Sequence, residues 1–351
     1  MTMSYEESLL RATRLAFAPF AFQTARILRD SGALTAMKRA RPFGVTTEEL
    51  QKATGLSAYA VESLCEAGLS FELCRLTEEG RWALTPVGNC ILSDAMTRVN
   101  MDFTQDVCYK GAFHLEEALV HGRPAGLREL GDWPTIYEGL SILPEPARTS
   151  WFAFDHFYSD RAMPPAIEIV KQGRARRLLD VGGNTGKFAR RYTTADPDVH
   201  VTIADLAGQL GIAAEENAQY THRDRIHLAP VDLLDPDCAL PQGFDAVWMS
   251  QFLVCFSKPE IVSILDRARD ALEPDGTLWI LDTYWDNTPN EVAKYCLHGT
   301  SLYFTTMANG NSRMYSLADT LRLLARAGLE VVTRHDGIGD AHTLLECRRI
   351  R

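Results

Sequence analysis

The sequence predicts an α/β protein in which a mainly helical winged-helix domain precedes a doubly wound sheet whose final strand is antiparallel. A glycine-rich turn directly follows a short apolar strand at residues 178–181. Further strand-like segments alternate with helical stretches, as in parallel sheets. These segments are residues 200–205, 226–232, 244–250 and 277–282, and a hairpin of 330–335 with 342–347 ends the chain.

Residues 1–100 form the predicted winged helix. An apolar-rich helix over 17–39 breaks near Ser31-Gly32, two short helices follow, and a β-ribbon turns at Glu79-Gly80. Winged helices often read DNA, but the helix at 57–68 carries two glutamates and no lysine or arginine. Phosphate repulsion opposes docking of such a helix. We therefore expect no nucleic-acid binding, and the alternative for this domain is a dimerisation module.

Residues 101–170 are predicted to be a helical connector, and residues 171–351 the sheet domain. The segment 150–159 places five aromatic side chains and His156 in ten positions. One interpretation is a buried linking helix whose aromatic residues are core. The other is a wall of an aromatic substrate pocket, and the sequence favours neither.

Composition excludes several classes of protein. The 351 residues carry a net charge of −10, which disfavours a general nucleic-acid coating role. No apolar run reaches the roughly 18 residues of a membrane span, and the N-terminus lacks the features of a signal peptide. The eight cysteines are scattered without a C-x-x-C pair, so we expect reduced thiols and a cytoplasmic location. No metal-ligand spacing is present.

The glycine-rich turn identifies the expected ligand. A dinucleotide fold requires G-x-G-x-x-G, but Asn184 and Lys187 occupy its second and third glycine positions. The pattern that fits is Asp180-x-Gly182-x-Asn184-x-Gly186, which resembles the D/E-x-G-x-G-x-G loop of class I S-adenosylmethionine methyltransferases. Asparagine tolerates left-handed backbone better than most residues, so its replacement of the middle glycine is a mild departure.

Acidic residues end several predicted strands. Asp205 follows the second strand, where a carboxylate can accept hydrogen bonds from ribose hydroxyls. Asp232 ends the third strand and Asp282 the fifth. Because the carboxyl ends of parallel strands meet at one edge, these acids and Asp180 should lie together beside the glycine loop.

With a winged helix, a connector and this loop in that order, the chain resembles the plant-type (caffeate-like) O-methyltransferases and their bacterial small-molecule relatives from about residue 15 onward. The resemblance implies an S-adenosylmethionine cofactor, an S-adenosylhomocysteine product and a homodimer formed through the N-terminal domain. It also implies a small aromatic or polyketide-like acceptor, free or carrier-bound. The expected cofactor residues are Asp180, Gly182, Gly183, Asn184, Gly186, Asp205, Leu206, Asp232, Leu233, Ser250 and Gln251.

The catalytic segment departs from this family. Its members carry Leu-His-Asp-Trp after the fourth strand, and that histidine deprotonates the acceptor hydroxyl. Here Val254 occupies the histidine position and Cys255-Phe256 replaces Asp-Trp. Asp282 matches the family glutamate that orients the histidine. The cofactor site is therefore expected to be intact, whereas the usual base is missing.

Three explanations follow from the missing base. His298 or His156, which follows Asp155, could be a relocated base for oxygen methylation. Alternatively, a phenol ring could be methylated at carbon, which is the reading we favour because the family histidine is absent. The third is that no methyl group is transferred, as in another enzyme reaction or a ligand-sensing winged-helix regulator. The expected acceptor-lining residues are Phe154, Phe252, Tyr303 and Met307.

Overall fold

The computed structural model describes residues 3–235 and 237–351. The chain divides into two compact units, one ending at Asp102 and one beginning at Phe103, and each is described by itself. The segment predicted to be a connector lies almost entirely in the second unit. No helix of the described residues is both long enough and apolar enough to cross a bilayer.

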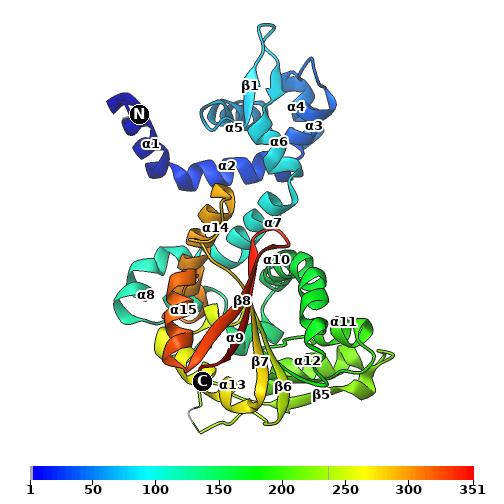
Figure 1. The fold of residues 1–351 in the computed structure, drawn as a ribbon. Helices are drawn as coiled ribbons and strands as arrows, with labels where there is room; N and C mark the ends of the chain where they lie inside the picture. The colour runs from blue at the N-terminus through cyan, green and yellow to red at the C-terminus, as the bar shows by residue number, and fades with distance from the viewer. Residues whose placement is uncertain (1–2, 236) are drawn as a thin grey trace. The chain divides into compact units, whose positions relative to one another are not determined.

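The first unit has the predicted winged-helix order (Figure 1). The break near Ser31 is confirmed, because Gly32 adopts a left-handed φ of 88° between two helices. Thr46 caps the next helix in a capping box, and Gly55 ends it with a φ of 73°. The helices are α1 (Tyr5–Ala16), α2 (Ala18–Asp30), α3 (Ala33–Arg39), α4 (Thr47–Thr54), α5 (Ala58–Ser70), α6 (Pro86–Ser93) and α7 (Ala95–Phe103).

The predicted ribbon is the antiparallel pair β1 (Cys74–Leu76) and β2 (Trp82–Leu84). Its buried residues join those of the helices in a single core. That core includes Leu28, Leu34, Met37, Leu50, Cys65 and Trp82. The sequence analysis did not predict α1, and this helix has no buried residue in the chain.

The second unit is built on a seven-stranded sheet with the order β5-β4-β3-β6-β7-β9-β8. The first five strands in this order are parallel, whereas β9 is antiparallel to β7 and β8, so the predicted antiparallel final strand is confirmed. The strands are β3 (Arg177–Val181), β4 (His200–Asp205), β5 (Ile226–Pro230), β6 (Phe244–Ser250), β7 (Leu272–Thr283), β8 (Leu329–Ile338) and β9 (His342–Arg349).

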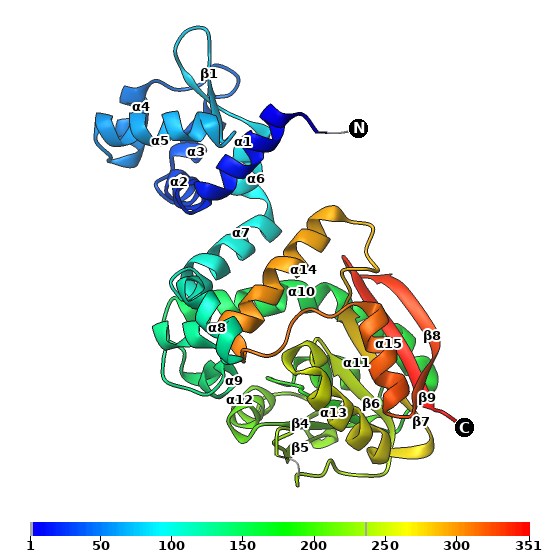
Figure 2. The same ribbon diagram turned by 90° about the vertical axis from the view of Figure 1, so that its left-hand side faces the viewer.

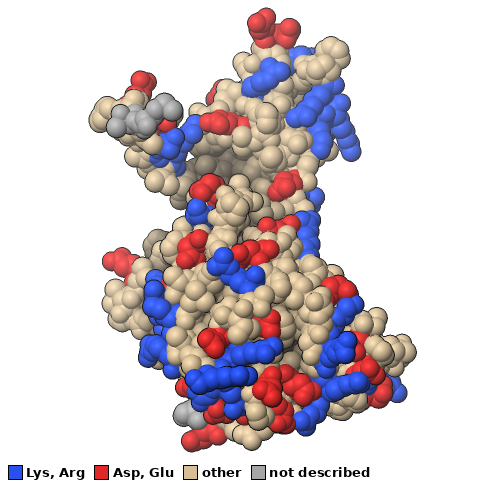
Figure 3. Space-filling model, viewed as in Figure 1, with Lys and Arg blue, Asp and Glu red and all other residues tan. Residues whose placement is uncertain are grey.

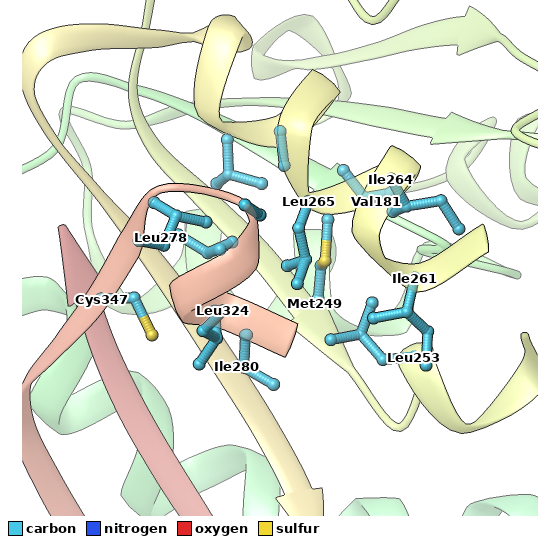
Figure 4. Close-up of a cluster of buried hydrophobic side chains, with 14 of the residues drawn as sticks. Val181, Met249, Leu253, Ile261, Ile264, Leu265, Leu278, Ile280, Leu324 and Cys347 are labelled. Carbon is cyan, nitrogen blue, oxygen red and sulfur yellow. The ribbon is translucent and has the colours of Figure 1, made fainter. Parts of the chain in front are cut away.

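Helices cover both faces of the sheet (Figures 1 and 2). One face packs against α13 (Lys258–Ala271) and α15 (Leu317–Arg326), and Figure 4 shows side chains of α13 against Val181 and Met249 of the sheet. The other face packs against α10 (Ala147–Val170), α11 (Lys187–Ala195) and α12 (Ala207–Asn217). This is the doubly wound arrangement that the strand–helix alternation predicts.

Several strand boundaries differ from the prediction, and two of the differences have a clear reason in the strand pairing. The strand expected over 226–232 ends at Pro230, because its pairing partner β4 ends at Asp205 in the same register. The strand expected over 277–282 begins earlier, at Leu272, so that Pro274, Asp275 and Gly276 lie inside β7. There the pairing with β6 shifts between Phe244 and Ala246, so these residues form an irregularity rather than a separate turn.

Short helices and α14 (Glu291–Tyr303) pack together beside the carboxyl edge of the sheet. The short segments between α7 and α10 are η1 (Thr104–Cys108), η2 (Gly111–His114), α8 (Leu115–His121), η3 (Ala125–Glu129), α9 (Ile136–Gly139) and η4 (Leu140–Ile142). The short helix η7 (Leu253–Cys255) and the π-helix η8 (Phe304–Ala308) join the same cluster, whereas η5 (Lys171–Gly173) and η6 (Arg223–Arg225) precede β3 and β5 and are not part of it. On the face drawn in Figure 3, acidic and basic side chains are interspersed over this unit.

Candidate active site at the carboxyl edge of the sheet

The glycine loop between β3 and α11 approaches its neighbours closely. Gly182 has a φ of 74°, and a Cβ at this position would lie 2.1 Å from the Phe252 ring. Gly186, with a φ of 76°, is the N-cap of α11. Asn184 adopts a φ of 51°, so the asparagine takes the left-handed conformation that the loop requires. The loop therefore leaves the first turn of α11 free to face a polar or anionic ligand group.

Asp205 holds the loop to the end of β4. Its carboxylate accepts hydrogen bonds from the Asn184 amide at 2.8 Å and the Leu206 amide at 2.7 Å. Burial raises the pKa of this carboxyl, and the two amides partly offset the rise. Each carboxylate oxygen has a second lone pair, so Asp205 can still accept ligand hydroxyls.

Asp180 lies beneath the loop. A Cβ on Gly183 would lie 2.6 Å from Asp180 Oδ2, which explains why glycine stands there. Burial and the neighbouring Asp205 raise the pKa of Asp180 well above its usual range. Three buried polar atoms at this edge have no partner in the described protein: Asp180 Oδ2, Asn184 Oδ1 and Ser250 Oγ. Unpartnered polar atoms beside a glycine cradle fit a ligand with many polar groups, as a nucleoside cofactor is.

Asp232 and Leu233 follow β5 at the same edge. Asp232 is exposed, and its carboxylate accepts a hydrogen bond from the Leu234 amide at 2.9 Å. Leu233 is buried in the core beneath α13. Gln251, directly after β6, has a φ of 50°, and its amide bonds Leu281 O at 2.8 Å. Strained backbone of this kind is concentrated at ligand sites.

The position of the family histidine is apolar. Val254 lies in η7 and is buried in a cluster with Tyr303 and Met307. Phe252, predicted to line the acceptor site, packs against Gly182 and meets Phe256 edge-on at 4.9 Å. The valine side chain at position 254 cannot accept a proton, so a catalytic base must come from another residue.

Aromatic side chains from three segments meet beside this cluster. Trp151 Nε1 of α10 donates a hydrogen bond to Tyr303 OH of α14 at 2.8 Å. Phe154 stacks on Phe103 with ring centroids 4.0 Å apart, and Phe103 meets Tyr303 edge-on at 4.9 Å. The segment 150–159 thus contributes both to the core and to an aromatic wall. Met307 is fully buried, with its sulfur against two glycines of η2 and η3.

The three candidate proton acceptors lie in different surroundings. His298 is on the exposed side of α14, with its ring 5.3 Å from Trp285. His156 is half-buried on α10, and burial together with Lys187 lowers its pKa. Asp282, at the end of β7, is 2% exposed and accepts a hydrogen bond from the Thr283 amide at 2.8 Å. Burial raises the pKa of Asp282 to about 7.

Comparison with known proteins identifies both units. Residues 10–82 match the Dimerisation2-like domain, and residues 161–330 match the O-methyltransferase domain. The chain joins a Dimerisation2-like domain to an O-methyltransferase domain. It is therefore an enzyme of the methyltransferase class, and its cofactor is S-adenosylmethionine. The residues that would hold the cofactor are those of the glycine loop and the acids around it.

Two curated relatives show the range of chemistry around this methyltransferase. It is 24% identical over 294 residues to the L-tyrosine C(3)-methyltransferase of Streptomyces lavendulae, which covers 83% of this chain and 79% of the relative. It is 34% identical over 123 residues to the aclacinomycin 10-hydroxylase RdmB of Streptomyces purpurascens. That match covers 35% of this chain and 32% of the hydroxylase.

Two solved structures share the fold of the methyltransferase. The apo form of the S-adenosylmethionine-dependent methyltransferase SibL has a TM-score of 0.71 at 24% identity, covering 97% of this chain and 98% of SibL. The O-methyltransferase NcsB1, in complex with S-adenosylmethionine and 2-hydroxy-5-methyl naphthoic acid, has a TM-score of 0.67 at 20% identity. This match covers 93% of the methyltransferase and 95% of NcsB1.

The structure also adds site residues that the sequence analysis missed. Trp151 donates a hydrogen bond to Tyr303, which lies 152 residues later in the chain, so a local sequence pattern cannot predict this contact. Tyr137 of α9 lies beside Cys255, and burial raises the pKa of both groups.

Proposed function

We propose that this methyltransferase acts on a small phenolic acceptor and places the methyl group on a ring carbon next to the hydroxyl. The observation that carries the proposal is the burial of Val254 in an apolar cluster, where the O-methyltransferases that this chain resembles keep a histidine. A relative named as a C(3)-methyltransferase of L-tyrosine supports the choice of a ring carbon.

In the proposed step the ring carbon forms a bond to the methyl carbon while the bond from that carbon to sulfur breaks. S-adenosylmethionine, when bound, supplies the methyl group on a sulfonium, and S-adenosylhomocysteine is the thioether product. The ring hydrogen is then lost as a proton and aromaticity returns. The protein must orient the acceptor and accept protons, and orientation supplies much of the rate.

Asp282 is our proposed proton acceptor. Its pKa of about 7 suits proton transfer near neutral pH. It also follows Leu281, which pairs with Ser250 at the end of β6, so Asp282 lies beside the start of the segment that replaces the family's catalytic residues. His298 is exposed in the chain, so it has this role only if another surface covers it.

Blocked acceptors test the position of methylation. Labelled S-adenosylmethionine is offered with 4-alkylphenols whose two ring carbons next to the hydroxyl are either free or both methylated. We expect methyl transfer to the free phenols alone, and none in the Asp205→Ala variant, which loses the cofactor. Equal transfer to the blocked phenols would contradict carbon methylation and favour oxygen methylation with a relocated base such as His298.

A second candidate function rests on one comparison. The relative named as a 10-hydroxylase is 34% identical to this chain, compared with 24% for the C(3)-methyltransferase, although the match covers only 35% of this chain. Under this alternative the protein binds S-adenosylmethionine without transferring its methyl group. The unblocked phenols distinguish the two functions, because consumption of acceptor without S-adenosylhomocysteine would support the alternative.

We also propose that the protein is a cytoplasmic homodimer that binds no DNA. Support for the dimer comes from α1 and the start of α2, whose apolar side chains are exposed in the chain: Leu9, Leu10, Leu15, Phe17 and Phe20. The described cysteines are all free thiols, which fits a reducing compartment. Light scattering should give twice the chain mass, and a gel shift at low salt should show no DNA complex.

A further inference from the structure

A buried glutamine lies in the first turn of α12, at the carboxyl edge of the sheet. The helix begins two residues after Asp205, which is the last residue of β4, so its N-terminus lies at this edge. Gln209 is the third residue of the helix and is 6% exposed. Its Oε1 atom is buried and has no hydrogen-bond partner among residues 3–235 and 237–351. A buried amide oxygen of this kind needs a donor that the protein itself does not supply.

Helix geometry directs the Gln209 side chain toward this edge. In an α-helix every Cα–Cβ bond tilts toward the N-terminus, and a side chain covers the turn that precedes it. Gln209 therefore covers the start of α12, where Asp205 Oδ1 accepts a hydrogen bond from the Leu206 amide at 2.7 Å. Leu206 is the N-cap and gives no side-chain bond, and the amides of residues 207–209 have no partner within the helix. An acceptor oxygen thus lies beside backbone donors at one end of α12.

The start of α12 belongs to the same site as the glycine loop. One oxygen of Asp205 accepts the Leu206 amide, and the other accepts the Asn184 amide at 2.8 Å, so a single carboxylate joins the helix to the loop. Gln209 Oε1 is thereby the fourth buried oxygen at this edge without a partner in the described residues. The other three are Asp180 Oδ2, Asn184 Oδ1 and Ser250 Oγ.

We propose that Gln209 is a further cofactor-binding residue, whose Oε1 accepts a hydrogen bond from the nucleoside part of S-adenosylmethionine. The nucleoside offers two kinds of donor, the adenine amine and the ribose hydroxyls. A carboxylate at the position of Asp205 binds the ribose in related nucleotide folds. Because Gln209 covers the turn that follows Asp205, the nucleoside rather than the amino-acid part of the cofactor is its expected partner.

The Gln209→Met variant tests this role, since methionine keeps the length of the side chain and lacks the amide. Calorimetric titration of the full-length protein measures binding of S-adenosylhomocysteine and of 5′-methylthioadenosine, which is the nucleoside without the amino-acid part. We expect the variant to bind both about 10-fold more weakly than the wild type, because a donor of the ligand is left unpaired. The matched control is Gln172→Met, which changes an exposed glutamine of η5 and should bind both ligands with wild-type affinity.

Stability without ligand separates a binding role from a structural one. Gln209→Met removes a buried oxygen that has no partner in the described protein, so the cofactor-free variant should be at least as resistant to urea as the wild type. A glutamine that only supported the fold would show the opposite pair of results, lower resistance to urea and unchanged affinity. The expected signature of a binding residue is therefore lower affinity without lost stability.

Once both ligands bind the variant more weakly, 5′-methylthioinosine identifies the donor, because a carbonyl oxygen replaces the adenine amine. If this replacement weakens binding to the wild type but not to Gln209→Met, the donor is the amine. If it changes both proteins by the same factor, the donor is a ribose hydroxyl.

Three results would overturn the inference. The first is wild-type affinity of Gln209→Met for both ligands, and the second is a loss of affinity accompanied by lower stability of the cofactor-free variant. The third is a loss confined to S-adenosylhomocysteine, which would assign Gln209 to the amino-acid part of the cofactor. These are binding measurements, so failure of carbon methylation leaves them standing.

Discussion

The two halves of the site differ in how far they keep the family pattern. On the cofactor half, the glycine loop, Asp180 and Asp205 occupy the expected positions and hold one another in place. On the acceptor half, Val254 has joined an apolar cluster, and Asp282 has no histidine at position 254 to orient. We propose that the first half holds the methyl donor and the second half selects the acceptor, so that the chemistry can change through the second half alone.

Changing the cofactor half should have the largest effect. In Gly182→Ala the new methyl group would lie 2.1 Å from Phe252 at a φ of 74°. Strain and displacement of the ring should cost about 3 kcal/mol or more, or roughly 100-fold in S-adenosylmethionine affinity. Calorimetric titration measures this loss.

Gly211→Ala is the control for this prediction. Gly211 lies in α12 with no atom within 4 Å of an added Cβ. We expect unchanged cofactor affinity and a gain in stability of about 0.5–1 kcal/mol, since alanine is the better helix former. Wild-type affinity in Gly182→Ala would contradict our account of the loop.

Asp282 gives the acceptor half a pH-dependent stability. Its pKa in the folded protein, about 7, lies above the value near 4 of an unfolded aspartate. Between these values the folded state binds more protons, so its contribution to stability falls as pH rises and is fully lost above pH 7. Asp282→Asn removes the charge. Its free energy of unfolding at pH 8 should therefore exceed that of the wild type by about 2–4 kcal/mol.

Urea unfolding of the cofactor-free protein at several pH values measures this difference. The gap between Asp282→Asn and the wild type should narrow steadily as pH is lowered from 8 toward 4. A gap that is constant over this range would mean that Asp282 is not an unusual acid in the folded protein.

Restoring the family residue tests whether the acceptor half lacks only a base. Val254→His places a polar ring among apolar side chains, and we expect a loss of about 1–3 kcal/mol in unfolding free energy. The methylated position should not change. The control is Val292→His on the exposed side of α14, with an expected change within about 0.5 kcal/mol. Oxygen methylation by Val254→His would show that a single residue separates this acceptor half from the family pattern.

Removing the hydrogen bond between Trp151 of α10 and Tyr303 of α14 should have the smallest effect. Trp151→Phe removes the indole donor from Tyr303 OH and should raise the acceptor KM several-fold, for about 1 kcal/mol. A double-mutant cycle with Tyr303→Phe isolates the pair. We expect a coupling free energy of about 0.5–1.5 kcal/mol, and additive effects would remove this bond from the account.

Local patterns were enough to predict the shape of the glycine loop and the sheet edge where the acids lie. The loop requires glycine where backbone approaches Phe252 and Asp180, and strand–helix alternation places the acids at one edge. The strand boundary at Pro230 and the irregularity inside β7 depend on pairing partners, which local composition does not report. The helix α1 was missed because none of its residues is buried within the chain.

The acceptor half was harder to predict because it is assembled from distant segments. Trp151 and Tyr303 are 152 residues apart, and a helix turns by about 100° per residue, so neighbouring side chains face different surroundings. That rotation decides which side chains of α10 meet α14, and the structure shows that Trp151 is one of them. Sequence reasoning recognised the helix but could not fix its rotation.

The position of the transferred methyl group tests the central claim most directly. The protein is incubated with S-adenosylmethionine that carries a ¹³C methyl group and with a 4-alkylphenol whose two ring carbons next to the hydroxyl are free. The account predicts that the carbon NMR signal of the product is that of a methyl group on an aromatic ring. A methoxy signal would contradict it, because the acceptor half would then perform oxygen methylation without the family histidine.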